Sequence, residues 1–160
     1  MTEILRLENL TRVFNQPNGA FGKPRQMTAV RDVSLSVNKG DVVGIVGESG
    51  CGKSTLARLI LRLVEPTSGR VFHDGTDITQ LSHRALQAAR KNMSMVFQDP
   101  YSSLDPRYTV ADCLAEPYVV QGAKVPEGRI DTLLSQVGLS RAMAQSYPHQ
   151  LSGGQRQRVG

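Results

Sequence analysis

The sequence has no tryptophan, only two cysteines and 5 % aromatic residues among its 160 positions. Cys51 and Cys113 are too few for a disulfide framework and show no metal-ligand spacing, so a reducing compartment is expected. The longest apolar run, residues 42–46, is far shorter than the roughly 18 residues that a membrane-spanning helix needs. The first ten residues contain charges and no apolar core, which argues against a signal peptide there. We therefore expect a soluble chain without a transmembrane segment.

Positive charge exceeds negative charge moderately, with 19 lysines and arginines against 14 aspartates and glutamates and a net charge of +5. The basic residues are scattered, and the few aromatic side chains make a poor base-stacking surface, so nucleic acid is not an expected partner. Apolar residues make up 39 % and charged residues 21 %, which is typical of a globular protein of one domain.

Hydrophobic patterns divide the chain near residue 98 into a part with strands and a later part with helices only. A continuous apolar run at 41–47 predicts a strand buried on both faces, and Pro, Gly and Asn predict a long surface loop at 15–26. The helix expected at 53–64 has an apolar stripe of Leu56, Leu59, Ile60 and Leu63. The other expected strands are 4–10, 30–37, 70–73 and 93–97, and the other expected helices are 82–91, 109–121, 126–137 and one that begins near Ser152.

Residues Gly47–Ser54 spell GESGCGKS and match the pattern G-x-x-x-x-G-K-[ST] between an expected strand and an expected helix. Glycines allow the backbone to turn its N–H groups toward an anion, and the helix that begins near Lys53 directs its positive end to the same place. Lys53 supplies a positive charge for the β- and γ-phosphates, and the Ser54 hydroxyl ligates Mg²⁺. A chance glycine-rich turn is the alternative, and the flanking strand and helix disfavour it.

The predicted nucleotide-binding residues of this segment are Gly47, Glu48, Ser49, Gly50, Cys51, Gly52, Lys53, Ser54 and Thr55. Cys51 occupies a free position of the pattern. We interpret it as a tolerated small residue rather than a reactive thiol.

A second glycine motif, Leu151–Gln155 (LSGGQ), precedes the last expected helix. Its serine can cap that helix, and the two following glycines expose backbone N–H groups to an anion. Two phosphate-binding segments, far apart in one sequence, indicate a nucleotide held between two surfaces. The residues assigned to the second surface are Ser152, Gly153, Gly154 and Gln155.

Together these motifs resemble those of the nucleotide-binding subunits of the ATP-binding cassette (ABC) family. Gly47–Ser54 resembles the Walker A motif, Leu151–Gln155 the signature motif, and Gln98 in MSMVFQDP the Q-loop glutamine. The resemblance implies an α/β fold of the P-loop NTPase (RecA-like) type. Its nucleotide-binding core, with an antiparallel β-part, would cover residues 1–98, and an α-helical subdomain ending in the signature motif would cover 99–160.

The family resemblance also implies a head-to-tail dimer that binds ATP and Mg²⁺. Lys53 of one copy and Ser152–Gln155 of the other would grip one ATP. Ser54 and Gln98 would hold Mg²⁺, and Gln98 would report the γ-phosphate to a membrane partner. Taken alone, Gln98 would more simply be a polar residue that caps a turn at a strand end, and the surrounding motifs favour the Q-loop interpretation.

Two apolar residues resemble the family's adenine-contacting positions. Phe14, in TRVF after the first expected strand, resembles the aromatic residue that stacks on adenine, and Val30 is expected to pack on the other side of the ring. A core aromatic on an edge strand remains an alternative for Phe14.

The segment Gln98–Arg107 resembles the Q-loop region of oligopeptide and dipeptide importers, as do GESGCGKST and YPHQLSGGQRQR. Its two Asp-Pro pairs make a stiff loop, which suits docking on integral membrane permease subunits, although a simple surface turn is the alternative. Nickel and glutathione importers share this branch. The implied location is the cytoplasmic face of the membrane, as a peripheral subunit, with a heterodimer favoured over a homodimer and a solute-binding protein as an indirect partner.

After Gln155 no apolar strand ending in Asp, no catalytic Glu and no switch His follows, and His73, His83 and His149 do not match the switch position. We therefore assign no catalytic residue beyond a supporting role for Gln98. We expect a chain incomplete at its C-terminus that binds ATP without efficient hydrolysis. A soluble non-transport ABC ATPase, a phosphonate-degradation component and a non-catalytic remnant are the alternatives, whereas a GTP switch lacks its N-K-x-D motif.

Overall fold

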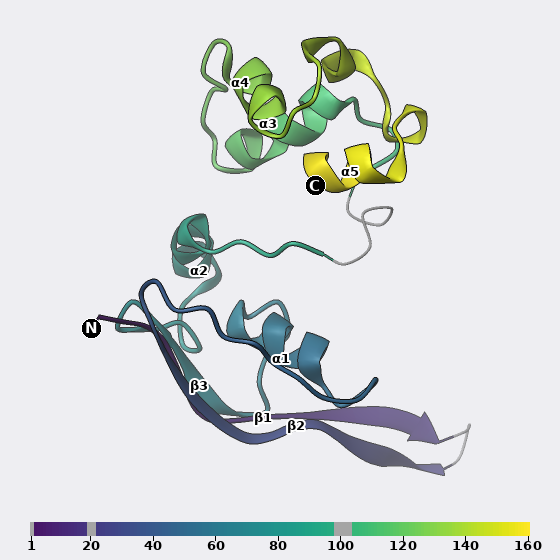
Figure 1. Ribbon diagram of the computed structural model, residues 1–160. Coiled ribbons are helices and arrows are strands. Elements are labelled where there is room, and N and C mark those ends of the chain that lie inside the picture. Colours follow the sequence, from purple (N-terminus) through teal and green to yellow (C-terminus); the bar gives the residue numbers. More distant parts are fainter. Residues whose placement is uncertain (1, 19–21, 98–103) are drawn as a thin grey trace. The chain divides into compact units, whose positions relative to one another are not determined.

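The computed structural model describes residues 2–18, 22–97 and 104–160, and the chain divides into two units (Figure 1). The first unit covers Met1–Ser94 and the second Met95–Gly160. The division lies four residues before the break expected at residue 98.

An antiparallel sheet of four strands forms the first unit (Figure 1). The strands lie in the order β2-β1-β3-β4, and β1 is central because it pairs with both β2 and β3. The strands are β1 (Glu3–Asn18), β2 (Gly22–Asn38), β3 (Ser68–His73) and β4 (Thr76–Asp77).

Two irregularities in the β1–β2 pairing decide which side chains enter the core. Asn9 has a positive φ of 49°, and the register shifts between Leu7 and Leu10, so both leucines are buried. Asp32 on β2 has a φ of 50°, and the Asn9 amide donates to its carboxylate at 2.7 Å. Simple alternation would have placed Asn9 rather than Leu10 on the buried face; the bulge corrects this.

The prediction of a loop at 15–26 is wrong for the residues of this range that the structure describes. β1 continues to Asn18, and β2 begins at Gly22, with Asn15 paired to Gln26. The Pro, Gly and Asn residues therefore lie mostly in or beside a long hairpin, because backbone pairing overrides their local preference for turns.

The strands expected at 41–47 and 93–97 are also absent from the described structure, where neither segment pairs with a strand. Val42 and Val46 have 99 % and 94 % of their surface exposed instead of being buried. An apolar run becomes a strand only when another strand bonds to its backbone, and the four-stranded sheet does not include these segments.

Two short helices and a 3₁₀ turn complete the first unit: α1 (Lys53–Ile60), α2 (His83–Ala89) and η1 (Arg90–Asn92). Leu56 and Leu59 of α1 and Leu86 of α2 join the core formed by the strands. Helix α1 ends four residues before the expected Val64, since Arg62 adopts a left-handed φ of 51°. Leu63 consequently leaves the expected apolar stripe and is 47 % exposed.

The second unit is helical, as expected. Val110, Leu134, Leu139 and Leu151 form its buried core. Its elements are α3 (Val110–Val120), α4 (Arg129–Gln136), η2 (Arg141–Gln145), η3 (Pro148–Gln150) and α5 (Gly153–Val159). Among the helices of the described residues, none is long and apolar enough to cross a membrane.

Candidate functional site

Two glycines with positive φ shape the segment before α1. Gly50 has a φ of 81°, and Gly52, the N-cap of α1, has a φ of 100°. A Cβ atom at Gly52 would lie 2.1 Å from the carbonyl oxygen of Ala29 on β2, so only glycine lets the loop approach that strand. The same close approach brings β2 to the beginning of α1.

The Lys53 side chain lies over the loop that precedes it. Its ammonium donates to the carbonyl oxygens of Gly47 at 2.8 Å and Glu48 at 2.7 Å, and it lies 3.7 Å from the Cys51 sulfur. A full positive charge is therefore held beside the amino-terminal end of α1, where the helix dipole adds positive potential. Both features favour an anion.

A hollow of about 340 Å³ lies at this end of α1. The loop and helix contribute Gly50–Thr55, and the hairpin contributes Phe14 from β1 and Met27, Thr28 and Ala29 from β2. The structure thus brings Phe14 to the predicted phosphate loop, Gly47–Ser54, although Phe14 lies 36 positions before Gly50 in the sequence. The lining of the hollow therefore includes both an aromatic ring and a lysine.

The remaining predicted residues of this segment have different surroundings. Ser54 and Thr55 line the hollow, whereas Gly47, Glu48 and Ser49 are exposed outside its lining. Val30, expected beside the nucleotide base, is only 6 % exposed and packs in the core of the sheet.

A metal site made of protein side chains alone is absent from the described residues, which contain no cluster of three or more His, Cys, Asp or Glu. A hydroxyl such as that of Ser54, next to a phosphate-binding loop, fits Mg²⁺ that is bound mainly through phosphates and water. Gln98, the other expected Mg²⁺ contact, lies outside the described residues.

The signature segment lies in the second unit and forms a capped helix start. The Ser152 hydroxyl accepts from the Gln155 backbone N–H at 3.3 Å, and the Gln155 side chain accepts from the Ser152 N–H at 2.8 Å. This reciprocal capping box agrees with the capping role expected for Ser152. Gly153 and Gly154 form the first turn of α5, and a Cβ at Gly154 would meet no atom within 4 Å.

The described end of the Gln98–Arg107 segment contains an ion pair. Asp105 accepts from the Arg107 backbone N–H at 3.0 Å and from its guanidinium at 3.0 and 2.6 Å. These hydrogen bonds lower the pKa of the Asp105 carboxyl from 3.8 to about 2. Leu104, the residue before Asp105, is buried. The end of this segment is therefore held both by the burial of Leu104 and by the ion pair of Asp105 with Arg107.

Both cysteines are free thiols. Cys51 is exposed in the phosphate loop, and Cys113 on α3 is partly buried. Burial raises the pKa of the Cys113 thiol, with a smaller contribution from nearby carboxylates.

Sequence reasoning missed three residues of the hollow, namely Met27, Thr28 and Ala29. The missed signal is the hairpin pairing, in which Met27 faces Phe14 across β1 and β2. A hairpin in place of the loop predicted at 15–26 would have placed these residues beside Phe14.

A larger hollow of about 550 Å³ in the second unit is lined in part by Leu104, Asp105 and Cys113.

The family model described as ABC transporter matches residues 30–160, which include the phosphate loop and the signature segment. The chain belongs to the ABC transporter family. A probable peptide ABC transporter ATP-binding protein of Sinorhizobium fredii is 47 % identical over 98 % of this chain and 46 % of its own length. An oligopeptide transport ATP-binding protein of Bacillus subtilis is 44 % identical over 98 % of this chain and 49 % of its own length.

Among solved structures, the chain resembles a dimeric post-hydrolysis state of the ATP-binding cassette MJ0796 bound to ADP and Pi. The TM-score is 0.82 at 31 % identity, over 98 % of this chain and 66 % of that one. The expected P-loop NTPase fold, with an antiparallel β-part and a helical part, is thereby confirmed. This ABC chain spans about half the length of the two curated relatives.

Proposed function

We propose that this chain is the ATP-binding part of an ABC importer for peptides or related small solutes, powered by ATP binding and hydrolysis. The observation that carries the proposal is the hollow at the start of α1, where the phosphate loop and Phe14 meet. The relatives are named for peptide and oligopeptide transport, which supports this class of cargo.

Each part of the hollow suits one part of ATP. Lys53 would balance the charge of the β- and γ-phosphates, and the backbone N–H groups of Gly50–Lys53 would donate to phosphate oxygens. The Ser54 hydroxyl, together with Gln98, would hold Mg²⁺, which when bound neutralises negative charge on the phosphates. Phe14 would stack on the adenine, because an aromatic ring offers a flat apolar face to a base.

The second nucleotide contact in this proposal comes from another subunit. Ser152–Gln155 of one copy would face Lys53 of the other in a head-to-tail dimer, with a heterodimer favoured. The dimeric state of the MJ0796 cassette supports such an assembly. By itself, this 160-residue chain is proposed to bind ATP without efficient hydrolysis, since none of its residues is assigned as the catalytic glutamate or the switch histidine.

The segment Gln98–Arg107 is proposed to dock on integral membrane permease subunits at the cytoplasmic face, where a solute-binding protein acts indirectly. The Asp105–Arg107 ion pair and the buried Leu104 support this, because they hold the end of the segment in one shape. The 550 Å³ hollow beside these residues offers room for a partner side chain.

ATP affinity tests the nucleotide-binding part of the proposal. Lys53→Ala removes the charge and is expected to weaken ATP binding at least about tenfold by isothermal titration calorimetry. Lys39→Ala, which removes an exposed lysine in the turn after β2, is the matched control and should leave ATP affinity unchanged. Equal affinities of the two variants would contradict the proposed site.

Turnover and partners test the remaining parts. Phosphate release by the isolated chain at about 1 s⁻¹ or faster, abolished in Lys53→Ala, would contradict the proposed lack of hydrolysis. Recovery of the protein from its own cells together with a polytopic membrane protein is expected for an importer. Recovery without any membrane subunit, in a form that hydrolyses ATP, would favour a soluble ABC ATPase instead.

A further inference from the structure

Arg12 lies against the ring of Phe14. The two residues are two positions apart on β1. The guanidinium carbon of Arg12 is 4.4 Å from the centroid of the Phe14 ring, which is a cation–π contact. Phe14 lines the nucleotide hollow and Arg12 is not among its lining residues, which agrees with a guanidinium on the ring face turned away from the hollow.

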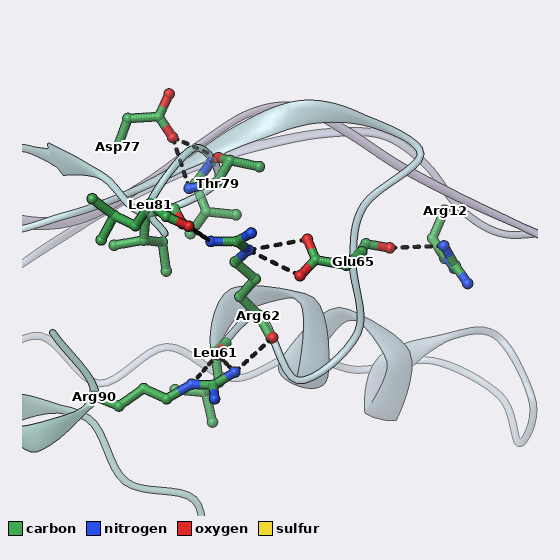
Figure 2. Close-up of polar contacts among 10 residues, drawn as sticks. Arg12, Leu61, Arg62, Glu65, Asp77, Thr79, Leu81 and Arg90 are labelled. Carbon is green, nitrogen blue, oxygen red and sulfur yellow. Dashed lines mark hydrogen bonds and ion pairs between the residues drawn. The ribbon is translucent and has the colours of Figure 1, made fainter. Parts of the chain in front are cut away.

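A hydrogen bond to the backbone holds the Arg12 side chain over the ring. Its Nη1 donates to the carbonyl oxygen of Glu65 at 2.8 Å (Figure 2). Its Nε is buried and has no hydrogen-bond partner in the part of the chain that the structure describes. A buried N–H without an acceptor is unfavourable. The contact of the guanidinium with the Phe14 ring offsets this cost in the observed orientation.

The Glu65 carbonyl that accepts from Arg12 belongs to a turn that is itself held by hydrogen bonds. Arg62 donates to both carboxylate oxygens of Glu65, at 3.1 and 3.0 Å, and to the carbonyl oxygens of Ile78 and Leu81 (Figure 2). Arg90 donates to the carbonyl of Arg62 at 2.7 Å. This turn follows α1, whose other end carries the phosphate loop, so the Phe14 ring is positioned relative to the loop.

We propose that Arg12 is a positioning residue that holds the Phe14 ring for stacking on the purine base of the bound nucleotide. The inference rests on the proposed function. The guanidinium stabilises the ring by contact with one face and leaves the other face for the base, giving a stack of cation, ring and base. Arg12 therefore contributes to the base-dependent part of nucleotide affinity and not to the phosphate-dependent part.

The test separates these two parts by measuring the affinities of the full chain for ATP and for inorganic triphosphate, each with Mg²⁺, by calorimetry. Arg12→Met keeps a long apolar side chain and removes the cation. It is expected to weaken ATP binding about three- to fivefold and to leave triphosphate binding unchanged. Arg31→Met, at an exposed arginine of β2, is the matched control and should change neither affinity.

Two further variants keep the test decisive. Phe14→Leu is expected to weaken ATP binding about tenfold, and adding Arg12→Met to it should have no further effect, since Arg12 acts through the ring. Arg12→Lys retains a cation and should bind ATP within about twofold of the unsubstituted chain. If Arg12→Met yields too little folded protein, Arg12→Lys takes its place, and a loss of ATP affinity much larger than twofold in this variant would contradict a role of the cation over the ring.

Three results would overturn the inference alone: an unchanged ATP affinity of Arg12→Met, an equal loss for ATP and triphosphate, or full additivity with Phe14→Leu. The second of these would mean that Arg12 only supports the fold. Failure of the unsubstituted chain to bind ATP is a different outcome. It would contradict the proposed function, and the inference would fall with it.

Discussion

Gly50 and Gly52 of the phosphate loop share a positive φ but differ in their surroundings. A Cβ at Gly50 would meet no atom within 4 Å, whereas a Cβ at Gly52 would meet the Ala29 carbonyl oxygen at 2.1 Å. Conformational strain therefore acts at both positions, but a backbone collision acts at Gly52 alone. Comparing substitutions at Gly50 and Gly52 therefore distinguishes the cost of a left-handed backbone from the cost of the backbone collision.

Gly52→Ala is expected to lower the free energy of unfolding by about 1–3 kcal/mol more than Gly50→Ala, because β2 or the loop must move to admit the methyl group. Urea unfolding followed by circular dichroism measures the difference. Gly50→Ala serves as the control for strain. Equal destabilisation of the two variants would mean that the loop does not lie against Ala29.

At the scale of single elements, side-chain capping decides where helix α3 of the second unit begins. Thr109 accepts from the Asp112 backbone N–H, and the Asp112 carboxylate accepts from the Thr109 hydroxyl and N–H, which forms a capping box for α3. These hydrogen bonds lower the pKa of the Asp112 carboxyl. Helix α3 accordingly starts at Val110, one residue after the expected boundary.

Thr109→Ala removes the hydroxyl that caps α3 and is expected to lower the free energy of unfolding by about 1 kcal/mol. Ser135→Ala, at an exposed serine inside α4, is the control and should change stability by less than about 0.5 kcal/mol. Urea unfolding measures both. A loss as large for Ser135→Ala as for Thr109→Ala would argue against a specific capping effect.

Acid is expected to weaken the Asp105–Arg107 segment. The pKa of Asp105 lies at about 2 in the folded chain against 3.8 ordinarily, so the unfolded chain binds more protons between these values. The stabilisation is present above about pH 4 and is lost as the pH falls toward 2. Unfolding midpoints at pH 5.5 and 2.5 should therefore fall less in Asp105→Asn than in the unsubstituted chain, and salt should reduce the difference because the pair is exposed. An identical fall in both proteins would contradict the ion pair.

At the scale of the whole molecule, a set of apolar side chains lies outside both cores. Val42, Val46 and Val96 are mostly exposed, although their segments have the composition of buried strands. Exposed apolar segments of this kind favour association between copies. The cores themselves are small and consist mainly of leucine and valine.

The double variant Val42→Thr, Val46→Thr is expected to reduce light scattering on concentration, without lowering the free energy of unfolding, since neither side chain is buried. Leu59→Ala gives the contrast: that side chain is fully buried, and its loss should lower the free energy of unfolding by about 2–5 kcal/mol. Destabilisation by the valine changes would mean that this segment packs against the protein.

Local chemistry made much of the site predictable. The glycine pattern, Lys53 and the beginning of α1 depend on backbone conformation and charge over a few residues, and the structure contains them as expected. The capping role of Ser152 is equally local and is present. The family followed from these motifs and is confirmed by the match over residues 30–160. The roles assigned to the individual residues stay predictions.

Pairing between distant segments decided the rest. The hairpin that carries Met27 to Phe14, the exposure of residues 41–47 and the burial of Val30 depend on which strands bond to one another. Arg12 reaches Glu65 across 53 residues of sequence, and no local pattern contains that contact. The sequence by itself therefore determined the phosphate loop and the family, because these follow from short-range conformation. Only the tertiary structure decided what surrounds the loop, because backbone hydrogen bonding and packing depend on neighbours that are remote in the chain.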